Sequence, residues 1–340
     1  MTVATFAQGH AAHAQPGHPE RPARLDAVRA AVDADPALRA LSWIEGGPAP
    51  REALERVHSA AYLDRIEALC RRGGGHLDAD TYATAASWNV ASRACGGLLA
   101  VVDAVVGGRA ANGFALGRPP GHHASPEQAM GFCLLSHVAV AARHAQAAHG
   151  AERVLVVDVD VHHGNGTQDA FYDDPSVLFV SSHQAGIFPG TGRLDETGAG
   201  AGEGTTVNVP VPAGTGDGLV GLYRRVLPPL AERFRPDLVL VSAGYDAHRL
   251  DPLAGLALSV RGLADVVGVV QETADRWAGG RLALSLEGGY HPDALAACVA
   301  ATLRRLLDPA ADVDDPFGPS VLPQPDLDPV TEAVLRRHGL

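Results

Sequence analysis

A strongly apolar stretch that ends abruptly in polar residues constrains this chain of 340 residues more than any other feature. Residues 154–157 are continuously apolar and mostly β-branched, which is typical of a buried strand in a parallel sheet. Asp158, Asp160 and His162 then follow at every second position. Because side chains on a strand alternate between its faces, we expect these three groups to project to one side of the strand's C-terminal end. Open α/β sheets place their ligands at that edge.

Two later segments repeat this pattern of an apolar strand followed by polar residues. The strand predicted at 237–243 leads into an acidic loop that reaches Asp251, and the strand predicted at 282–286 leads into Glu287, two glycines and Tyr290. Asp160, His162 and Asp251 would give a divalent ion three protein ligands and leave a position open for water and substrate, as catalytic zinc sites do. This oxygen-rich set suits Zn²⁺ and also admits Fe²⁺ or Co²⁺.

Each of these residues could instead have a purely structural role, without metal binding or catalysis. Asp251 precedes a proline and is typical of a turn, and Tyr290 could be a core residue. A histidine pair, His122 and His123, would by itself be ordinary polar surface or core, but here it follows a Pro-Pro-Gly turn that presets the backbone. The convergence of several such segments favours a metal-centred hydrolytic site.

With these segments together, the chain resembles the zinc-dependent histone deacetylase superfamily, in particular its class II-like bacterial deacetylase-like amidohydrolases, acetylpolyamine amidohydrolases and acetoin utilisation proteins. The resemblance is carried by the following runs: 17–25, 119–124, 131–133, 158–168, 188–192, 242–251 and 287–290. It implies a single-domain α/β fold of the arginase and deacetylase type, with three layers. It also implies a hydrolase that removes an acyl group from an amine.

The resemblance assigns roles to the residues of the predicted site. Asp160, His162 and Asp251 are implied to be the metal ligands. His123 is implied to be the general base that takes a proton from water and later protonates the leaving amine, with His122 as its electrostatic partner. Such a site works at neutral pH because a divalent ion lowers the pKa of water to about 7 and imidazole exchanges protons in that range.

Three further residues are implied to assist these groups. Asp158 would fix the tautomer of His122, and Asn165 would do the same for His123, where another branch of the family carries aspartate. Tyr290 would polarise the acyl carbonyl and stabilise the oxyanion. Because Asn165 is neutral, His123 should be less basic than with an aspartate partner.

The same comparison implies a substrate channel and a second cation. Phe132 and Phe188 would flank a narrow channel, and Gly131 would offer its carbonyl to the substrate N–H. A potassium ion would be held by Asp158, the backbone carbonyls of the metal-binding segment, and two serines, Ser181 and Ser182. Such an ion would orient the strand that carries the metal ligands.

The order of predicted elements indicates an open, mostly parallel sheet with helices on both faces. We expect strands at 3–6, 113–117, 154–160, 177–182, 237–243 and 282–286, with one more at 205–210. Helices are expected near 21–33, 52–71, 83–107, 135–149, 216–234, 260–277 and 293–307. Residues 1–307 would form the catalytic domain, and 308–340 a Pro- and Asp-rich tail with a short helix over 329–338 that packs on the surface or on a partner subunit.

Composition sets limits on partners and location. The net charge of −12 argues against nucleic-acid binding and mildly favours cationic substrates. Four cysteines without Cys-x-x-Cys spacing fit reduced thiols in a cytoplasmic protein. No signal peptide or membrane-crossing stretch is expected, and the sequence leaves the oligomeric state open.

The substrate is predicted from one position. Polyamine-specialised relatives carry an acidic residue directly after the Asp-Pro of the metal loop, whereas this chain has Leu253. An apolar residue there cannot pair with a distal ammonium, which favours an acylated lysine of a peptide or protein over acetylpolyamine or another small acylated amine. Two alternatives of other classes are an arginase-like ureohydrolase, which needs a binuclear manganese site, and a catalytically silent acyl-amine binder.

Overall fold

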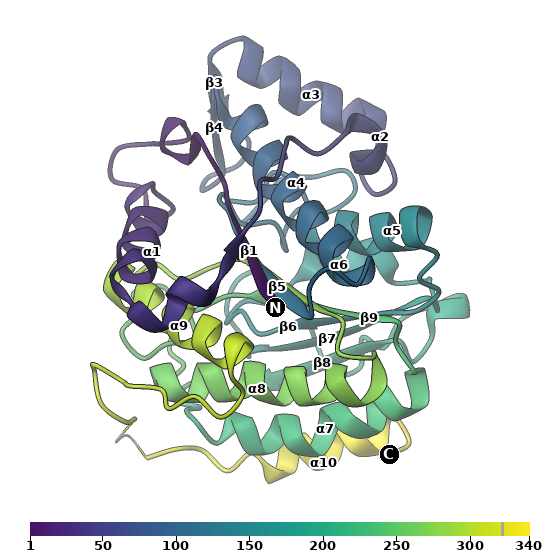
Figure 1. Ribbon diagram of the computed structural model, residues 1–340. Coiled ribbons are helices and arrows are strands. Elements are labelled where there is room, and N and C mark those ends of the chain that lie inside the picture. Colours follow the sequence, from purple (N-terminus) through teal and green to yellow (C-terminus); the bar gives the residue numbers. More distant parts are fainter. Residues whose placement is uncertain (321–322) are drawn as a thin grey trace.

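The computed structural model describes residues 1–320 and 323–340, and a single parallel sheet forms its centre (Figure 1). The strand order in this sheet is β2-β1-β5-β10-β9-β6-β7-β8, and each neighbouring pair is parallel. The strands are β1 (Thr2–Phe6), β2 (Ser42–Trp43), β5 (Asn112–Leu116), β6 (Val154–Asp158), β7 (Val177–Gln184), β8 (Thr206–Val211), β9 (Leu238–Ala243) and β10 (Leu282–Leu286). A separate antiparallel pair is formed by β3 (Gly74–His76) and β4 (Tyr82–Thr84).

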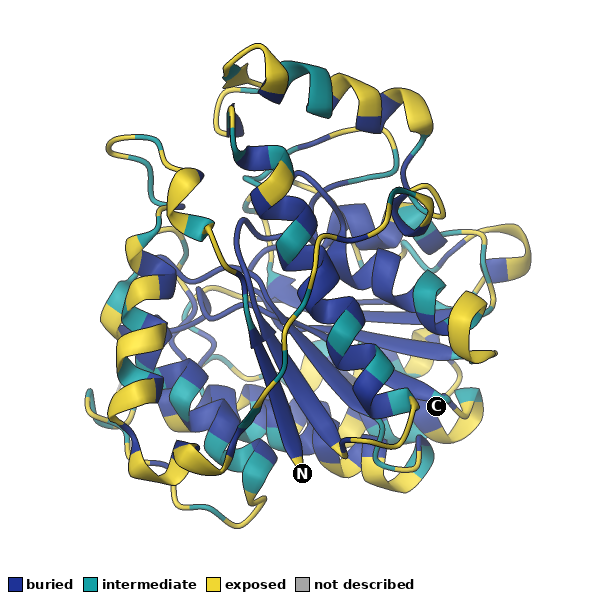
Figure 2. Ribbon diagram, turned by 45° about the horizontal axis from the view of Figure 1, so that its top comes forward, coloured by how far each residue is buried: buried dark blue, intermediate teal, exposed yellow. Residues whose placement is uncertain are grey.

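Helices cover both faces of the sheet, as the sequence predicts (Figure 1). The first face carries α3 (Ala60–Arg71), α4 (Ser87–Val106), α5 (His137–His149) and α6 (Asn165–Phe171). The second carries α1 (Ala23–Ala34), α7 (Leu219–Phe234), α8 (Val260–Trp277) and α9 (Pro292–Leu307). Residues of β5, β6, β9 and β10 alternate between the two apolar cores, so the central strands are buried on both faces (Figure 2).

The structure differs from the expected elements at several points, among them the short strands β2, β3 and β4, which were not expected. The helix predicted over 52–71 is divided into α2 (Arg51–Leu54) and α3, because the Ser59 side chain accepts a hydrogen bond from the Tyr62 backbone N–H and starts a new helix. The strand predicted over 154–160 ends at Asp158, so Asp160 and His162 lie in the following loop. Helix α6 was not expected, since its sequence contains glycine and asparagine.

Helix α4 also corrects the expectation that no stretch is long enough to cross a bilayer. By length and composition, Ser87–Val106 passes that test. In the folded chain, however, 72% of its most apolar window is buried inside the protein. It is packed as the core helix of a globular α/β fold.

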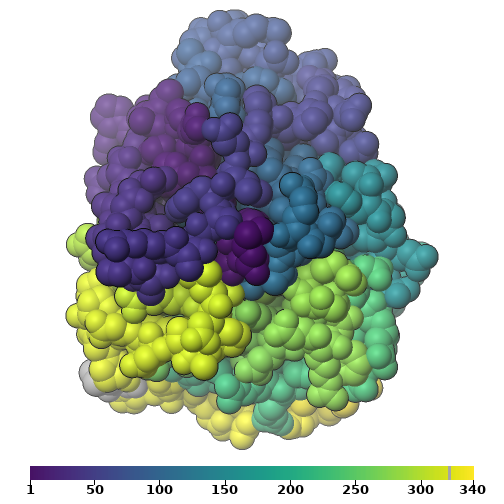
Figure 3. All heavy atoms as spheres, viewed as in Figure 1, coloured from purple at the N-terminus to yellow at the C-terminus, as the bar shows by residue number. Residues whose placement is uncertain are grey.

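The last helix packs on the second face of the sheet. Helix α10 (Asp328–Arg337) lies against α7, where Arg225 donates to Asp328 Oδ1 at 2.6 Å and Arg233 donates to the carbonyl of His338 at 2.5 Å. At the surface, N-terminal atoms up to α1 lie directly beside the C-terminal part around α9 (Figure 3). A domain boundary at residue 307 stays a prediction.

Candidate metal centre and channel

The candidate site lies at one edge of the sheet, where the segments that follow four neighbouring strands meet. In the order β5-β10-β9-β6, the segments that follow these strands are 117–123, 287–290, 244–251 and 159–163. Because the strands are parallel, their C-terminal ends meet at the same edge. Segments far apart in the sequence are therefore brought together there.

A compact acidic cluster lies at this edge. The Nδ1 atom of His162 is 3.2 Å from Asp160 Oδ1 and 3.3 Å from Asp246 Oδ2, and one donor atom from each residue lies within 4.8 Å of the others. Asp251 is adjacent: its carboxylate accepts from the backbone N–H of Tyr290 at 2.6 Å and from that of Leu253 at 3.0 Å. The structure thus brings Asp160 and His162 together, and the third member of the tightest group is Asp246 and not the expected Asp251.

Asp246 is the member of this cluster that sequence reasoning missed. It lies three positions after the end of β9, within the acidic loop that was recognised, yet no role was assigned to it. Its Oδ1 atom accepts from the backbone N–H of Val161 at 2.9 Å, which ties the β9 loop to the β6 loop. The available signal was its place in the polar segment that follows a buried strand, the same criterion that singled out Asp160.

The donor set fits a divalent cation. Asp246 Oδ2 is buried and makes no hydrogen bond; it faces only the His162 ring nitrogen at 3.3 Å, which it shares with Asp160, so it has room for a cation among the described residues. Two glycines allow the carboxylates to approach: a Cβ atom on Gly244 would lie 2.0 Å from Asp160 Oδ2, and one on Gly288 would lie 1.9 Å from Asp246 Oδ2. Burial and the negative charge of Asp160 raise the pKa of Asp246 to about 7, because both disfavour the ionised form of its carboxyl group. Carboxylate and imidazole donors are suited to Zn²⁺.

The two predicted histidines lie beside this cluster in different electrostatic environments. Burial alone would lower the pKa of His122, but the carboxylates of Asp160 and Asp158 raise it to about 10. Its Nδ1 atom lies 3.0 Å from Asp158 Oδ2. Burial lowers the pKa of His123 well below its ordinary value, and the neighbouring His122 and His162 lower it further. His122 is therefore cationic and His123 neutral near pH 7.

Asn165 determines the tautomer of His123. Its Oδ1 atom lies 2.8 Å from His123 Nδ1, while its Nδ2 group donates to the carbonyl of His123 at 3.4 Å and to the sulfur of Met130 at 3.3 Å. The two hydrogen bonds donated by Nδ2 fix the orientation of the Asn165 amide. Its Oδ1 atom must therefore accept a hydrogen bond from the Nδ1–H group of His123. The lone pair of His123 is left on Nε2.

Tyr290 is held by a buried cation. The guanidinium carbon of Arg24 lies 4.7 Å from the centre of the tyrosine ring, and Arg24 donates to the carbonyls of Gly289 at 2.6 Å and Glu287 at 2.5 Å. Burial raises the pKa of Tyr290 well above its ordinary value, so the phenol keeps its proton. Arg24 pairs in turn with the fully buried Glu20 at 3.1 Å. Both residues lie in or beside the matched run at 17–25, but sequence reasoning gave neither a role.

A cavity of about 190 Å³ leads from the surface to these groups. Its lining comprises Asp80, His123, Gly131, Phe132, His162, Phe188, Leu253 and Tyr290. All four predicted channel residues are among them. The ring of Phe132 meets that of Tyr290 edge to face at 5.5 Å, and the ring of Phe188 meets that of His123 at 5.0 Å. Asp80 was not predicted, and nothing local in the sequence distinguishes it.

The predicted potassium ligands are also near one another. Asp158 and Ser181 are register partners in the β6–β7 ladder, and all three side chains of Asp158, Ser181 and Ser182 are buried. The hydroxyl groups have partners within the protein: Ser181 Oγ lies 3.0 Å from His183 Nδ1, and Ser182 Oγ lies 2.7 Å from the Tyr223 hydroxyl. Potassium binding therefore stays a prediction.

Comparison with known proteins shows which family and fold this chain is similar to. A family model described as the histone deacetylase domain matches residues 18–306. Histone deacetylase 10, chloroplastic, from Oryza sativa subsp. japonica is 43% identical over 328 residues, covering 89% of this chain and 73% of that protein. The histone deacetylase-like amidohydrolase of Pseudomonas aeruginosa is 40% identical over 303 residues, covering 88% of this chain and 80% of that protein. The crystal structure of the HDA15 HD domain superposes with a TM-score of 0.88 at 36% identity, covering 99% of this chain and 95% of that one.

Proposed function

Because the chain belongs to the histone deacetylase family and is a hydrolase of that family, we propose that it is a zinc-dependent deacylase that removes an acyl group, typically acetyl, from the side-chain amine of lysine. The observation that carries this proposal is the position of the acidic cluster. His162 belongs both to the cluster and to the lining of the cavity, which also contains His123 and Tyr290. A linear acyl-amine that enters the cavity would therefore reach the cluster, the histidine and the phenol together.

The cluster would hold the ion through Asp160, His162 and Asp246, whose donor atoms lie within 4.8 Å of one another. Asp251, the third ligand expected from the sequence, lies beside this set, where its two oxygens accept from the backbone N–H groups of Leu253 and Tyr290. When bound, a divalent ion supplies polarisation of the acyl carbonyl and acidification of water. The ion proposed is Zn²⁺, with Fe²⁺ or Co²⁺ as substitutes that the same donors accept. A potassium ion near Asp158, Ser181 and Ser182 is proposed as a separate, orienting cation.

The two histidines divide the proton chemistry between them. His123 is neutral, with its Nδ1–H donated to Asn165 and its Nε2 lone pair free to take a proton from water. His122 is cationic beside Asp158 and stabilises negative charge that develops at the reacting carbonyl. The protonated imidazole of His123 then returns the proton to the leaving amine.

Tyr290 supplies the hydrogen bond to the oxyanion. Its phenol remains protonated and can donate, and Arg24 below the ring and the Asp251 contact to its backbone N–H fix its position. Gly131 at the channel wall offers its carbonyl to the substrate N–H. A rigid donor of this kind is typically worth about 2.7–4 kcal/mol in the transition state.

The channel favours an acylated lysine chain. Phe132 and Phe188 give the walls an apolar surface, and Leu253 lies at the entrance with 39% of its surface exposed. One observation favours a second candidate, an acetylpolyamine or other small acylated amine. Asp80 also lines this cavity, and its carboxylate could pair with a distal ammonium group.

A substrate panel on the chelated and the zinc-restored protein tests the proposal. We expect zinc-dependent release of acetate from acetyl-lysine peptides, and loss of that release in Asp160→Asn but not in the matched surface variant Asp33→Asn. Absence of metal-dependent release from every acyl-lysine peptide, acetylpolyamine and small acylamide would support a silent binder instead. Asp80→Asn separates the two substrate classes, because only polyamine turnover should fall. The cytoplasmic location also stays a prediction.

A further inference from the structure

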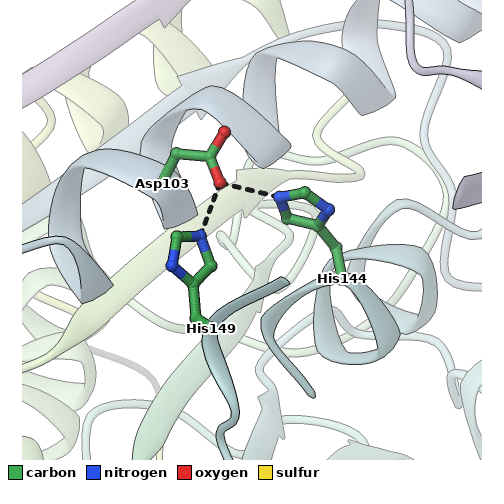
Figure 4. Close-up of side chains that lie close together, drawn as sticks. All are labelled: Asp103, His144 and His149. Atoms are coloured by element: carbon green, nitrogen blue, oxygen red, sulfur yellow. Dashed lines mark hydrogen bonds and ion pairs between the residues drawn. The ribbon is translucent and has the colours of Figure 1, made fainter. Parts of the chain in front are cut away.

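A second group of potential metal ligands lies between helices α4 and α5 (Figure 4). Asp103 belongs to the last turn of α4, and His144 and His149 belong to α5. The Nε2 atoms of both histidines lie 2.7 Å from the same oxygen of Asp103, Oδ1. The close-up shows the two rings directed at this oxygen from different sides. All three donor atoms fall within 4.8 Å of one another.

This group is remote from the catalytic edge. Helix α4 leads into β5 through residues 107–111, and α5 leads into β6 through 150–153, so both helices end at the N-terminal edge of the sheet. The candidate catalytic residues follow the C-terminal ends of the same strands. The length of a five-residue strand, about 16 Å at 3.3 Å per residue, separates the two edges.

The donor chemistry is that of a transition-metal site. Two imidazole nitrogens and one carboxylate oxygen are a common ligand set for Zn²⁺, and three protein ligands leave a position for water. Burial alone would raise the pKa of Asp103, but hydrogen bonds from His149 and His144 lower it, so the carboxylate is ionised at neutral pH. Neutral histidines in the Nδ1–H tautomer would present both Nε2 lone pairs to an ion.

The helix ends provide a second, independent reason for a cation at this place. Asp103 lies three residues before the end of α4, and His149 is the last residue of α5. The C-terminal end of a helix carries about half a negative charge from its unpaired carbonyls. Two such ends converge on the group, so the local potential attracts a positive ion in addition to the charge of Asp103.

Only a small movement is needed to admit an ion. Ligand atoms around a tetrahedral Zn²⁺ with bonds of about 2.0 Å lie about 3.3 Å apart, so the present contacts of 2.7 Å would open by roughly half an ångström. The side chains of Asp103, His144 and His149 are 42%, 17% and 23% exposed, so an ion can reach the group from solvent.

We propose that Asp103, His144 and His149 form a second metal site that takes a divalent transition-metal ion such as Zn²⁺ and joins the C-terminal ends of α4 and α5. The bound ion links α4 and α5, the helices that precede the strands β5 and β6. It stabilises the fold without taking part in hydrolysis. The site does not depend on the proposed function, because none of its residues lies at the catalytic edge.

Zinc stoichiometry of the full chain tests this site. Titration calorimetry and elemental analysis should give two Zn²⁺ per chain for the wild type and one for the double variant His144→Ala/His149→Ala. The control His76→Ala, an exposed histidine on β3, should keep two. The conservative variant Asp103→Asn, which preserves the shape of the side chain, should bind the second ion more weakly.

A background without the candidate catalytic ion isolates the second site. In Asp160→Asn, added Zn²⁺ should still bind at one equivalent and raise the melting temperature, and the rise should vanish when His144 and His149 are also replaced. Hydrolysis by the His144→Ala/His149→Ala protein should match that of the wild type. Equal zinc content in the wild type and this double variant, or no melting shift in Asp160→Asn, would overturn the proposal and leave these residues a hydrogen-bonded surface cluster.

Discussion

His58 is a buried histidine whose neutral form the fold requires, and it makes stability depend on pH in a defined direction. The residue lies between α2 and α3 and is 1% exposed. The backbone N–H of Ser136 donates to its Nε2 atom at 2.9 Å, and its Nδ1 atom lies 3.1 Å from the carbonyl of Ser125. One ring nitrogen must therefore accept and the other must donate. Protonation of Nε2 would remove the acceptor.

The size of the effect follows from the shift in pKa. Burial lowers the pKa of His58 from 6.5 to about 4 in the folded chain, whereas the unfolded chain keeps the ordinary value. The unfolded state thus binds more protons between these two values, and the stability contributed by neutral His58 is present above pH 6.5 and is lost as the pH falls toward 4. At 1.36 kcal/mol per pKa unit, the total loss is about 3 kcal/mol, of which about 2 kcal/mol appears by pH 5.

The variant His58→Gln provides the comparison, since an amide can donate to Ser125 and accept from Ser136 without titrating. Chemical denaturation of both chelated proteins from pH 7.5 to 5 gives the free energy of unfolding at each pH. Over this range the free energy of unfolding of the wild type should fall by about 2 kcal/mol more than that of the variant. The exposed control His76→Gln should follow the wild type. Parallel curves for His58→Gln and the wild type would refute the reasoning.

Three other predictions concern the candidate catalytic site. Tyr290→Phe should lower kcat by about a hundredfold or more through loss of the oxyanion donor while the zinc content stays the same, and unchanged turnover in steady-state kinetics would remove that role. Gly288→Ala should lower the zinc content measured by elemental analysis, because its Cβ would lie 1.9 Å from Asp246 Oδ2, whereas Gly268→Ala, with no atom within 4 Å, should keep it. Leu253→Glu should raise kcat/KM for acetylpolyamines relative to acetyl-lysine peptides, since the new carboxylate could pair with a distal ammonium; an unchanged ratio would remove this position from substrate selection.

Much of the fold was predictable because its signals are local. Apolar runs such as 154–157 and 238–241 are typical of buried strands, and their alternation with helices implies a parallel sheet. The boundaries were less predictable. Ser59 starts a new helix through a single side-chain hydrogen bond, and α6 forms from residues of low helix propensity because its position beside the sheet overrides them.

The sequence by itself determined which segments carry chemistry, because polar residues directly after buried strands need a partner or an ion wherever the strands lie. That reasoning singled out Asp160 and Tyr290, and the Pro-Pro-Gly turn singled out His122, without knowledge of the strand order; the roles of these residues came from the family resemblance. Only the tertiary structure decided which side chains meet. The order β5-β10-β9-β6 brings Asp246 against His162, and Arg24 packs under Tyr290 from 266 positions away. The packing of α4 on α5 likewise brings Asp103 together with His144 and His149. Contacts between residues this far apart in the sequence depend on how the helices pack, and no local residue pattern predicts them.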